Sequence, residues 1–205
     1  MKIKSVIFDL DGTLYDNSAL PLLVILNSPG RLRLLAAERR CRKRLAGRCL
    51  GDNPEESFLE AVSLESGIER AEVERWFFRE YLPLQARLLK RRFKPRKWVV
   101  PLLSRLKAEG VRLACFSDYC YIAEKLEALG IDPEIFDLLA DAVSFGGPKP
   151  CAKAAAKVLE ILETTPQEAL FVGDRTDTDK RSAEALGAGF LPADAVPDKL
   201  NGFGL

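Results

Sequence analysis

The chain has 205 residues, and 47% of them are hydrophobic, which suffices for one domain with a modest insertion. It contains no histidine, and this excludes Ser-His-Asp and Cys-His nucleophile pairs, HExxH zinc sites and the most common general base. The net charge is +1, but residues 17–97 hold 18 lysine and arginine residues against 10 aspartate and glutamate residues, which suggests an anionic substrate or partner.

The first predicted element is a buried strand over residues 5–10, because SVIFDL is short, apolar and β-branched. The segment 17–93 is predicted to be helical throughout, with helices over 19–27, 31–50 and 70–89. Asn53 and Pro54 are expected to begin another helix, since a cap and a first-turn proline stand together there. The aromatic run at 76–78 favours a core position in this helical segment over a base-stacking platform.

The predicted helix over 31–50 has an apolar stripe and a strongly basic remainder. The stripe consists of Leu34, Cys41, Leu45 and Cys49. The arginines of residues 31–48 are first interpreted as a solvated helix face, and second as a surface that steers an anionic substrate. Nucleic-acid binding ranks third, because residues 31–50 hold no aromatic residue between the charges.

Strands and helices alternate after Pro95, which is typical of a parallel sheet with right-handed crossovers. The predicted strands cover 112–118, 137–143, 169–174 and 187–192. The predicted helices cover 97–109, 121–129, 151–163 and 178–186. The fold class is therefore α/β, with a helical insertion after the first strand.

Acidic and hydroxyl residues follow three of the predicted strands. Asp9 and Asp11 end the first strand, Ser117 and Asp118 end the second, and Asp174 ends the strand over 169–174. In an open parallel sheet the binding site lies beyond the carboxyl ends of the strands. We therefore expect these side chains to meet in one crevice.

Three carboxylates in one crevice need a cation. At about 4 Å and an effective dielectric near 20, each like-charged pair costs on the order of 4 kcal/mol. A hard oxygen site of this kind suits Mg²⁺. Lys149, in the loop GPKP, adds a fixed positive charge, and the hydroxyl of Ser117 is suited to a phosphoryl oxygen. Together these groups predict phosphoryl transfer.

The motifs resemble those of the haloacid dehalogenase-like hydrolase superfamily. DLDGTL at 9–14, SD at 117–118, Lys149 in PKP and VGDRTDTD at 172–179 stand in the order of that family's four motifs and span most of the chain. The resemblance implies a Rossmann-like core with strand order 5-4-1-2-3 and an α-helical cap inserted after the first motif. Residues 1–16 and 94–205 are expected to form the core, and residues 17–93 the cap.

The resemblance also implies a role for each motif residue. Asp9 is the nucleophile that becomes an aspartyl-phosphate, and Asp11 is the general acid and then the general base. The carboxylates of Asp9 and Asp174 and the backbone carbonyl of Asp11 hold Mg²⁺, while Ser117 and Lys149 bind the phosphoryl oxygens. The expected supporting residues are Gly12, Thr13, Asp118, Asp177 and Asp179.

The sequence leaves two questions about the supporting residues open: which acid of the last motif acts in the site, and what Asp118 does. The last motif usually has a further acid four or five residues after Asp174, so the spacing prefers Asp179, with Asp177 acting through a water. Asp118 either orients its motif or caps the next helix.

The expected function is Mg²⁺-dependent hydrolysis of a small phosphomonoester. A sugar-phosphate mutase uses the same core, and a dehalogenase uses the nucleophile on carbon without Mg²⁺; Asp11 and Asp174 argue against the latter. A catalytically silent, anion-binding regulatory module is a further alternative, although it has no need of an intact set of Asp9, Asp11, Lys149 and Asp174. No motif identifies the substrate.

The cysteines and the N-terminal residues favour a cytoplasmic protein without a nucleic-acid or membrane partner. No apolar run reaches the roughly 18 residues of a membrane span, and the first one meets acid too early for a signal peptide. The five cysteines are odd in number and none are spaced as CxxC, so free thiols are expected. Cys120 and Cys151 lie near site motifs, and a helix N-terminus at Cys151 would lower its thiol pKa.

Overall fold

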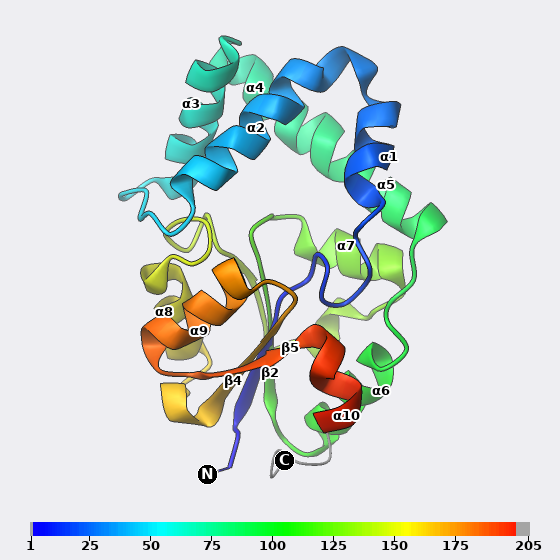
Figure 1. Cartoon of the computed structure of the whole chain (residues 1–205), viewed down its shortest axis with the longest axis vertical. Helices are drawn as coiled ribbons and strands as arrows, with labels where there is room; N and C mark the ends of the chain where they lie inside the picture. Colours follow the sequence, from blue (N-terminus) through cyan, green and yellow to red (C-terminus); the bar gives the residue numbers. More distant parts are fainter. Residues whose placement is uncertain (1, 200–205) are drawn as a thin grey trace.

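Five strands form one parallel sheet in this computed structural model, which describes residues 2–199 (Figure 1). They lie in the order β3-β2-β1-β4-β5, which is the order 5-4-1-2-3 counted from the opposite edge, so the predicted fold class is confirmed. Phe8 at the end of β1 lies level with Cys115 of β2 and Val172 of β4, so the three strands that precede the predicted site residues end together. The strands are β1 (Ser5–Phe8), β2 (Arg112–Ser117), β3 (Leu138–Asp141), β4 (Ala169–Gly173) and β5 (Gly189–Pro192).

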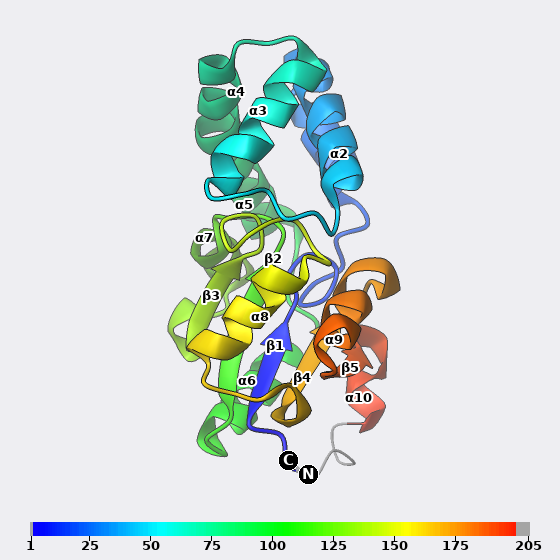
Figure 2. The same ribbon diagram turned by 90° about the vertical axis from the view of Figure 1, so that its left-hand side faces the viewer.

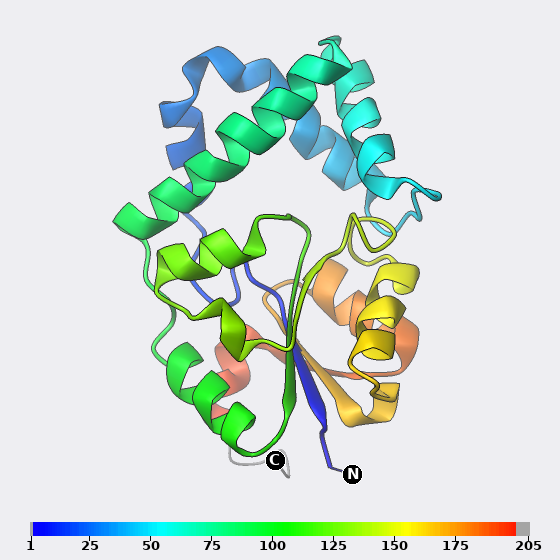
Figure 3. The same cartoon turned by 180° about the vertical axis from the view of Figure 1, so that it is seen from behind.

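Helices cover both faces of the sheet (Figures 1 and 3). One face carries α8 (Ala152–Ile161) and α9 (Arg181–Leu186), and the other carries α6 (Val99–Ala108), α7 (Ile122–Leu129) and α10 (Val196–Lys199). Alternate residues of a strand point to opposite faces. Val6 and Phe8 accordingly pack with α6 and α7 in one core, while Ile7 packs with α8 and α9 in a second.

A layer of helices stands beyond the carboxyl ends of the strands (Figures 1 and 2). We call residues 20–92, which form it, the helical insertion. Trp76 and Phe77 are buried within it, and Trp76 stacks on Tyr81 with 4.9 Å between the ring centroids, so these rings belong to its core. Its helices are α1 (Leu20–Asn27), α2 (Leu32–Leu45), α3 (Pro54–Ser66), α4 (Arg70–Trp76) and α5 (Leu82–Arg92), with a π-helical turn at Phe77–Tyr81. Short 3₁₀ turns occur at Pro29–Arg31, Pro133–Ile135, Pro166–Glu168 and Ala193–Ala195.

The prediction of one helix over 31–50 is wrong at its C-terminal end. α2 ends at Leu45, and residues 46–50 approach the loop between β3 and α8. The Gly47 N–H donates to the Pro148 carbonyl over 3.1 Å, and the Leu50 N–H donates to the Gly146 carbonyl over 2.8 Å. Residues 46–50 therefore satisfy backbone groups against the sheet's loop instead of continuing the helix.

The arginines of α2 have two different environments. Arg40 and Arg44 are exposed, and each donates to Glu65 of α3 over 2.7 Å, as expected of a solvated helix face. Arg42 lies among aromatic rings with its side chain only 13% exposed. Its guanidinium donates to the carbonyl oxygen of Asp118 over 2.6 Å. Arg42 thus joins α2 to the loop after β2, and assigning it to the solvated face is wrong.

Within residues 2–199, no helix taken singly has both the length and the apolar composition needed to cross a membrane. The consecutive segments Leu20–Asn27 and Pro29–Leu45 meet those criteria only when counted together, across a bend of 98°.

Candidate active site

Asp9 is the first residue beyond β1, and its backbone is still held by the sheet. The Asp9 N–H donates to the carbonyl oxygen of Val172 in β4 over 2.9 Å. Its side chain lies in a buried position, with Oδ1 accepting a hydrogen bond from Lys149 Nζ over 2.6 Å and Oδ2 accepting one from Thr13 Oγ1 over 2.8 Å. The sheet and two side-chain donors together fix the position of this carboxylate.

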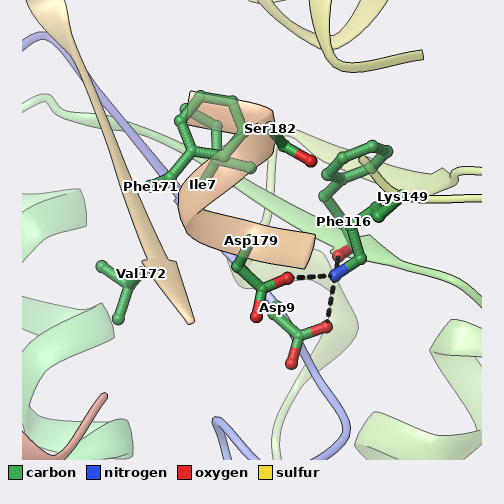
Figure 4. A pocket seen from close by; sticks show the side chains of 8 residues that line it. All are labelled: Ile7, Asp9, Phe116, Lys149, Phe171, Val172, Asp179 and Ser182. Carbon is green, nitrogen blue, oxygen red and sulfur yellow. Dashed lines mark hydrogen bonds and ion pairs between the residues drawn. The ribbon is translucent and has the colours of Figure 1, made fainter. Parts of the chain in front are cut away.

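Lys149 comes from the loop between β3 and α8 and is 3% exposed. Its ammonium group lies between the carboxylates of Asp9 and Asp179, 2.6 and 2.7 Å away, and also donates to the Phe116 carbonyl over 3.2 Å (Figure 4). The Asp118 carboxylate accepts the backbone N–H of Lys149 over 2.7 Å. Asp118 therefore orients the loop that carries Lys149 and does not cap α7.

Asp174 is the first residue beyond β4 and lies across from Asp9. Thr13 Oγ1 is also 3.3 Å from Asp174 Oδ1, so the threonine bridges the two acids. Gly12 has a positive φ of 103°, and a Cβ at this position would collide with the Asp174 carboxylate. The turn after β1 therefore requires glycine both for its backbone conformation and for the approach of Asp174.

One carboxylate oxygen from each of Asp9, Asp174 and Asp179 lies within 4.8 Å of the others. This group fits a hard divalent cation such as Mg²⁺, because all the donors are oxygen atoms and Lys149 balances only one of the three negative charges. Sequence analysis predicted Asp9 and Asp174 as ligands of this cation. Asp179, which was expected only in support, has an oxygen in the same group.

Burial and charge shift the pKa values of the site residues. Burial raises the pKa of Asp9 to about 8; the positive charge of Lys149 opposes this shift, and the negative charge of Asp179 adds to it. Loss of water around the carboxyl group and the charge of Asp179 also raise the pKa of Asp174. Burial favours neutral Lys149, but the Asp179 and Asp9 charges outweigh it and hold the Lys149 pKa well above its usual value. Burial, more than repulsion between the acids, is therefore the main cause of the raised pKa values of Asp9 and Asp174.

The side chain of Asp11 is turned towards a lysine that sequence analysis missed. Lys125 of α7 is completely buried, and its Nζ lies 3.0 and 2.8 Å from the two carboxylate oxygens of Asp11. The buried hydroxyl of Tyr15 also donates to Asp11 Oδ1. A signal for Lys125 exists in the sequence: it shares the apolar face of its helix with Ile122 and Leu126, where a lysine needs an anionic partner.

The remaining predicted site residues are placed as follows. Ser117 is buried at the end of β2, and its Oγ accepts the Tyr119 N–H over 3.1 Å. Asp177 is exposed and pairs with Arg175 over 2.6 Å, which lowers its pKa. Asp179, in contrast, is 4% exposed and holds Lys149. The geometry therefore separates the two acids of the last motif, with Asp179 inside the site and Asp177 at the surface.

The expectation of a lowered thiol pKa at Cys151 is wrong. Cys151 does precede α8 as its N-cap residue, and nearby backbone N–H groups favour the thiolate. Burial is the larger effect, however, and it raises the pKa of Cys151 above its ordinary value. Burial also raises the pKa of Cys120, to about 12.

Comparison with known proteins identifies the family. The profile described as haloacid dehalogenase-like hydrolase matches residues 3–187, so the chain belongs to this family. The described fold is shared with solved members: CbbY from Rhodobacter sphaeroides, solved in complex with phosphate, has a TM-score of 0.68 at 20% identity, with 93% of this chain and 85% of that chain covered. YfnB from Bacillus subtilis, solved with bound magnesium, has a TM-score of 0.64 at 17% identity, covering 93% and 88%.

Two curated relatives with higher sequence identity match a shorter part of the chain. A phosphoglycolate phosphatase from Aquifex aeolicus is 35% identical over 96 residues, which cover 46% of this chain and 44% of that protein. A glyceraldehyde 3-phosphate phosphatase from Methanocaldococcus jannaschii is 34% identical over 96 residues, which cover 46% and 42%. The match therefore spans less than half the length of these relatives.

Proposed function

We propose that this chain is a Mg²⁺-dependent phosphatase that hydrolyses a small phosphomonoester through an aspartyl-phosphate on Asp9. The observation that carries this proposal is the arrangement around Asp9: a buried carboxylate fixed by Lys149 and Thr13, beside two further acids suited to a hard cation. The curated relatives named as phosphatases of small phosphorylated metabolites support the same reaction class.

The proposed reaction consists of two displacements at phosphorus. A carboxylate oxygen of Asp9 attacks the phosphorus atom, the bond to the substrate alcohol breaks, and Asp11 gives its proton to that alcohol. Asp11 then takes a proton from a water molecule, whose oxygen attacks phosphorus and releases phosphate from Asp9. Lys149 and Ser117 hold the phosphoryl oxygens; because Ser117 Oγ accepts a hydrogen bond from Tyr119, its own proton stays available for this.

Asp9 and Asp174 would hold Mg²⁺, with Asp179 beside them or in direct contact. When bound, Mg²⁺ neutralises the charge of the acids and of the phosphoryl oxygens. Asp179 has a second task in this proposal, since it anchors Lys149 from the side opposite Asp9.

We further propose that residues 17–93 act as a cap on a core made of residues 1–16 and 94–205. The position of the helical insertion beyond the strand ends (Figure 2) supports this assignment. So do its contacts with the site loops, through Arg42 on the Asp118 carbonyl and through Gly47 on Pro148. A cap in this place would exclude bulk water during the transfer.

The fold alone does not separate phosphomonoester hydrolysis from its alternatives, because solved chains with this fold include an L-2-haloacid dehalogenase from Xanthobacter autotrophicus. A mutase would return the phosphoryl group to its substrate, and a regulatory module would bind phosphate without turnover. Phosphatase activity is preferred because Asp11 and Asp174 are both present and the buried Lys149 binds Asp9. Asp11 in particular is suited to give a proton to the leaving alcohol and to take one from water. Dehalogenation does not require the first of these transfers.

The proposal is tested by a screen of phosphorylated metabolites in which free phosphate is measured with Mg²⁺ and with EDTA. We expect at least one small phosphomonoester to release phosphate with Mg²⁺ and none to do so in EDTA. The same reactions, followed by phosphorus NMR, distinguish hydrolysis from phosphoryl return to the sugar. Isomerised substrate without free phosphate would establish a mutase, and unchanged substrate throughout would overturn the enzyme assignment.

We expect Lys125→Met to lower kcat/KM for alkyl phosphates by roughly 10- to 100-fold, because Asp11 loses the group that positions it. Alkyl leaving groups depend on proton transfer from Asp11, whereas activated aryl leaving groups depend on it much less. The variant should therefore show a steeper dependence of kcat/KM on the leaving group. Lys153→Met, in an exposed part of α8, is the matched control. An equal loss on every substrate would mean that Lys125 has only a structural role.

A further inference from the structure

Two cysteines from different layers of the fold meet beside the site. Cys49 follows α2 in the helical insertion, and Cys151 precedes α8, two residues after Lys149. Their Sγ atoms lie 3.4 Å apart, although 102 residues separate them in the sequence. The pair thus connects the helical insertion to the loop that supplies the buried lysine.

The main chain on both sides of this pair is held in place. Hydrogen bonds run from Gly47 to Pro148 and from Leu50 to Gly146, so the backbones on either side of Cys49 are fixed to the loop before Cys151. Gly147 has a positive φ of 156°, and a Cβ there would collide with the carbonyl oxygen of Arg48. The close approach of the two segments is therefore built into the backbone and does not depend on the cysteine rotamers.

We propose that Cys49 and Cys151 are a redox modification site, at which a peroxide oxidises the two thiols to a disulfide that fastens the helical insertion to the Lys149 loop. A disulfide requires the two sulfur atoms to come within bonding distance, about 2.0 Å. The two sulfur atoms are 3.4 Å apart, so they must approach by roughly 1.4 Å to form the bond.

The exposure of the two thiols sets the order of the steps. Cys49 is exposed and Cys151 is buried. The Cys49 thiolate attacks one oxygen of hydrogen peroxide, the O–O bond breaks, and the products are a sulfenic acid on Cys49 and, after protonation, one water. The sulfur of Cys151 then attacks the sulfur of Cys49, the S–O bond breaks, and the hydroxyl group leaves with the Cys151 proton as a second water. The two thiols lose two electrons, and the peroxide gains them.

The raised pKa of Cys151 agrees with this order. A buried thiol of raised pKa is a poor first nucleophile in bulk solvent. It is nevertheless positioned to resolve a sulfenic acid that forms in contact with it. Thioredoxin- or dithiothreitol-type reductants would attack the exposed sulfur of Cys49 and restore both thiols.

The consequence for activity rests on the proposed function. A disulfide would join the helical insertion to the loop of Lys149, whose ammonium group binds Asp9 and Asp179. If substrate enters when the insertion moves away from the strand ends, the covalent link restrains that movement. We therefore expect oxidation to remove most of the kcat/KM, and reduction to restore it.

The test treats the full chain with hydrogen peroxide, blocks the remaining thiols, and maps disulfide-linked peptides by mass spectrometry without reduction. We expect one peptide pair joined through Cys49 and Cys151, formed within one chain and cleaved by dithiothreitol. Cys49→Ser and Cys151→Ser should each abolish the link, while Cys120→Ser, the control for a nearby partly buried thiol, should retain it. Cys49→Ser should also keep its initial activity and show no loss that dithiothreitol reverses.

Two outcomes would count against the proposal, and a third would count against the proposed function instead. If both thiols persist in peroxide while circular dichroism shows a folded chain, Cys49 and Cys151 are not a redox modification site. A complete link with unchanged kcat/KM would overturn its effect on activity. If the reduced chain hydrolyses no phosphomonoester, the phosphatase proposal fails instead, and peptide mapping still decides whether the cysteine pair oxidises.

Discussion

Asp9→Asn is expected to abolish turnover while the chain stays folded. A neutral amide cannot form the acyl-phosphate, and loss of a nucleophile of this kind costs on the order of 10⁴-fold or more in kcat. The fold should survive, because the amide oxygen can still accept from Lys149, the amide NH₂ can donate to the Thr13 hydroxyl, and Lys149 keeps its ion pair with Asp179. Phosphate release and circular dichroism measured on the same sample check both parts.

The stability of this variant has a predictable pH dependence. The pKa of Asp9 is about 8 in the folded chain, against an ordinary value of 3.8. Between these values the folded state holds a proton that the unfolded chain has released, so wild-type stability falls as the pH rises through this interval. Asp9→Asn removes that contribution. In EDTA, its Tm should rise relative to that of the wild type as the pH is raised from about 5 to about 8.

Two results would contradict this account of Asp9. Near-normal phosphate release by a folded Asp9→Asn protein would remove Asp9 as the nucleophile. A Tm difference that stays constant with pH would mean that burial does not raise the pKa of Asp9 in the folded chain. A matched change at the surface acid, Asp177→Asn, controls for the loss of one negative charge and should leave turnover unchanged.

Much of this architecture is predictable from local patterns. The strands are short apolar runs between turn signals, and Asp9 and Asp174 each stand directly after one of them, so the parallel sheet brings these two acids together. Lys149 is predictable because the PKP loop joins a predicted strand to a predicted helix in the same alternation of strands and helices. These features depend on residues that are near one another in the sequence or share one end of the sheet.

The features that were missed depend on contacts between distant segments. The partner of Asp11 is Lys125, whose place on an apolar helix face is visible in the sequence, but whose target is fixed only by the packing of α7. The early end of α2 has a local signal in Gly47, whose φ is +76°, but the hydrogen bonds of residues 46–50 to residues about 100 positions later cannot be read from the sequence. The meeting of Cys49 with Cys151 likewise depends on the backbone hydrogen bonds that fix residues 47 and 50 to the loop before Cys151.

We expect activity to be lost in EDTA, restored by Mg²⁺, and inhibited by Ca²⁺. Mg²⁺ holds near-octahedral geometry at about 2.0–2.1 Å, whereas Ca²⁺ takes more ligands at longer distances. Ca²⁺ is therefore suited to capture a second oxygen of Asp9, which would turn the nucleophile away from phosphorus. Phosphate release is measured after EDTA treatment and addition of each ion. Full activity in excess EDTA, or equal rates with both ions, would disprove the metal requirement.

Binding of Mg²⁺ to the protein without substrate should be coupled to proton release. Below a pH of about 8 the carboxyl group of Asp9 is largely protonated in the metal-free chain, because its pKa is raised to about that value. Mg²⁺ then has to displace the proton, so its apparent affinity should increase as the pH rises towards 8 and level off above it. Calorimetry at pH 7 in two buffers with different ionisation enthalpies measures the released proton directly.

The acids of the last motif provide the decisive comparison for this metal site. Asp174→Asn and Asp179→Asn each remove a carboxylate from the group of three acids, so both should weaken Mg²⁺ binding in calorimetry. Asp177→Asn removes the same charge three residues after Asp174 and two before Asp179, but from an exposed acid that pairs with Arg175. It should leave the affinity unchanged. Asp179→Asn should also impair Lys149, because the ammonium group loses one of its two carboxylate partners. Equal weakening by all three changes would show that the acids attract Mg²⁺ only through their summed charge, and that they form no defined site.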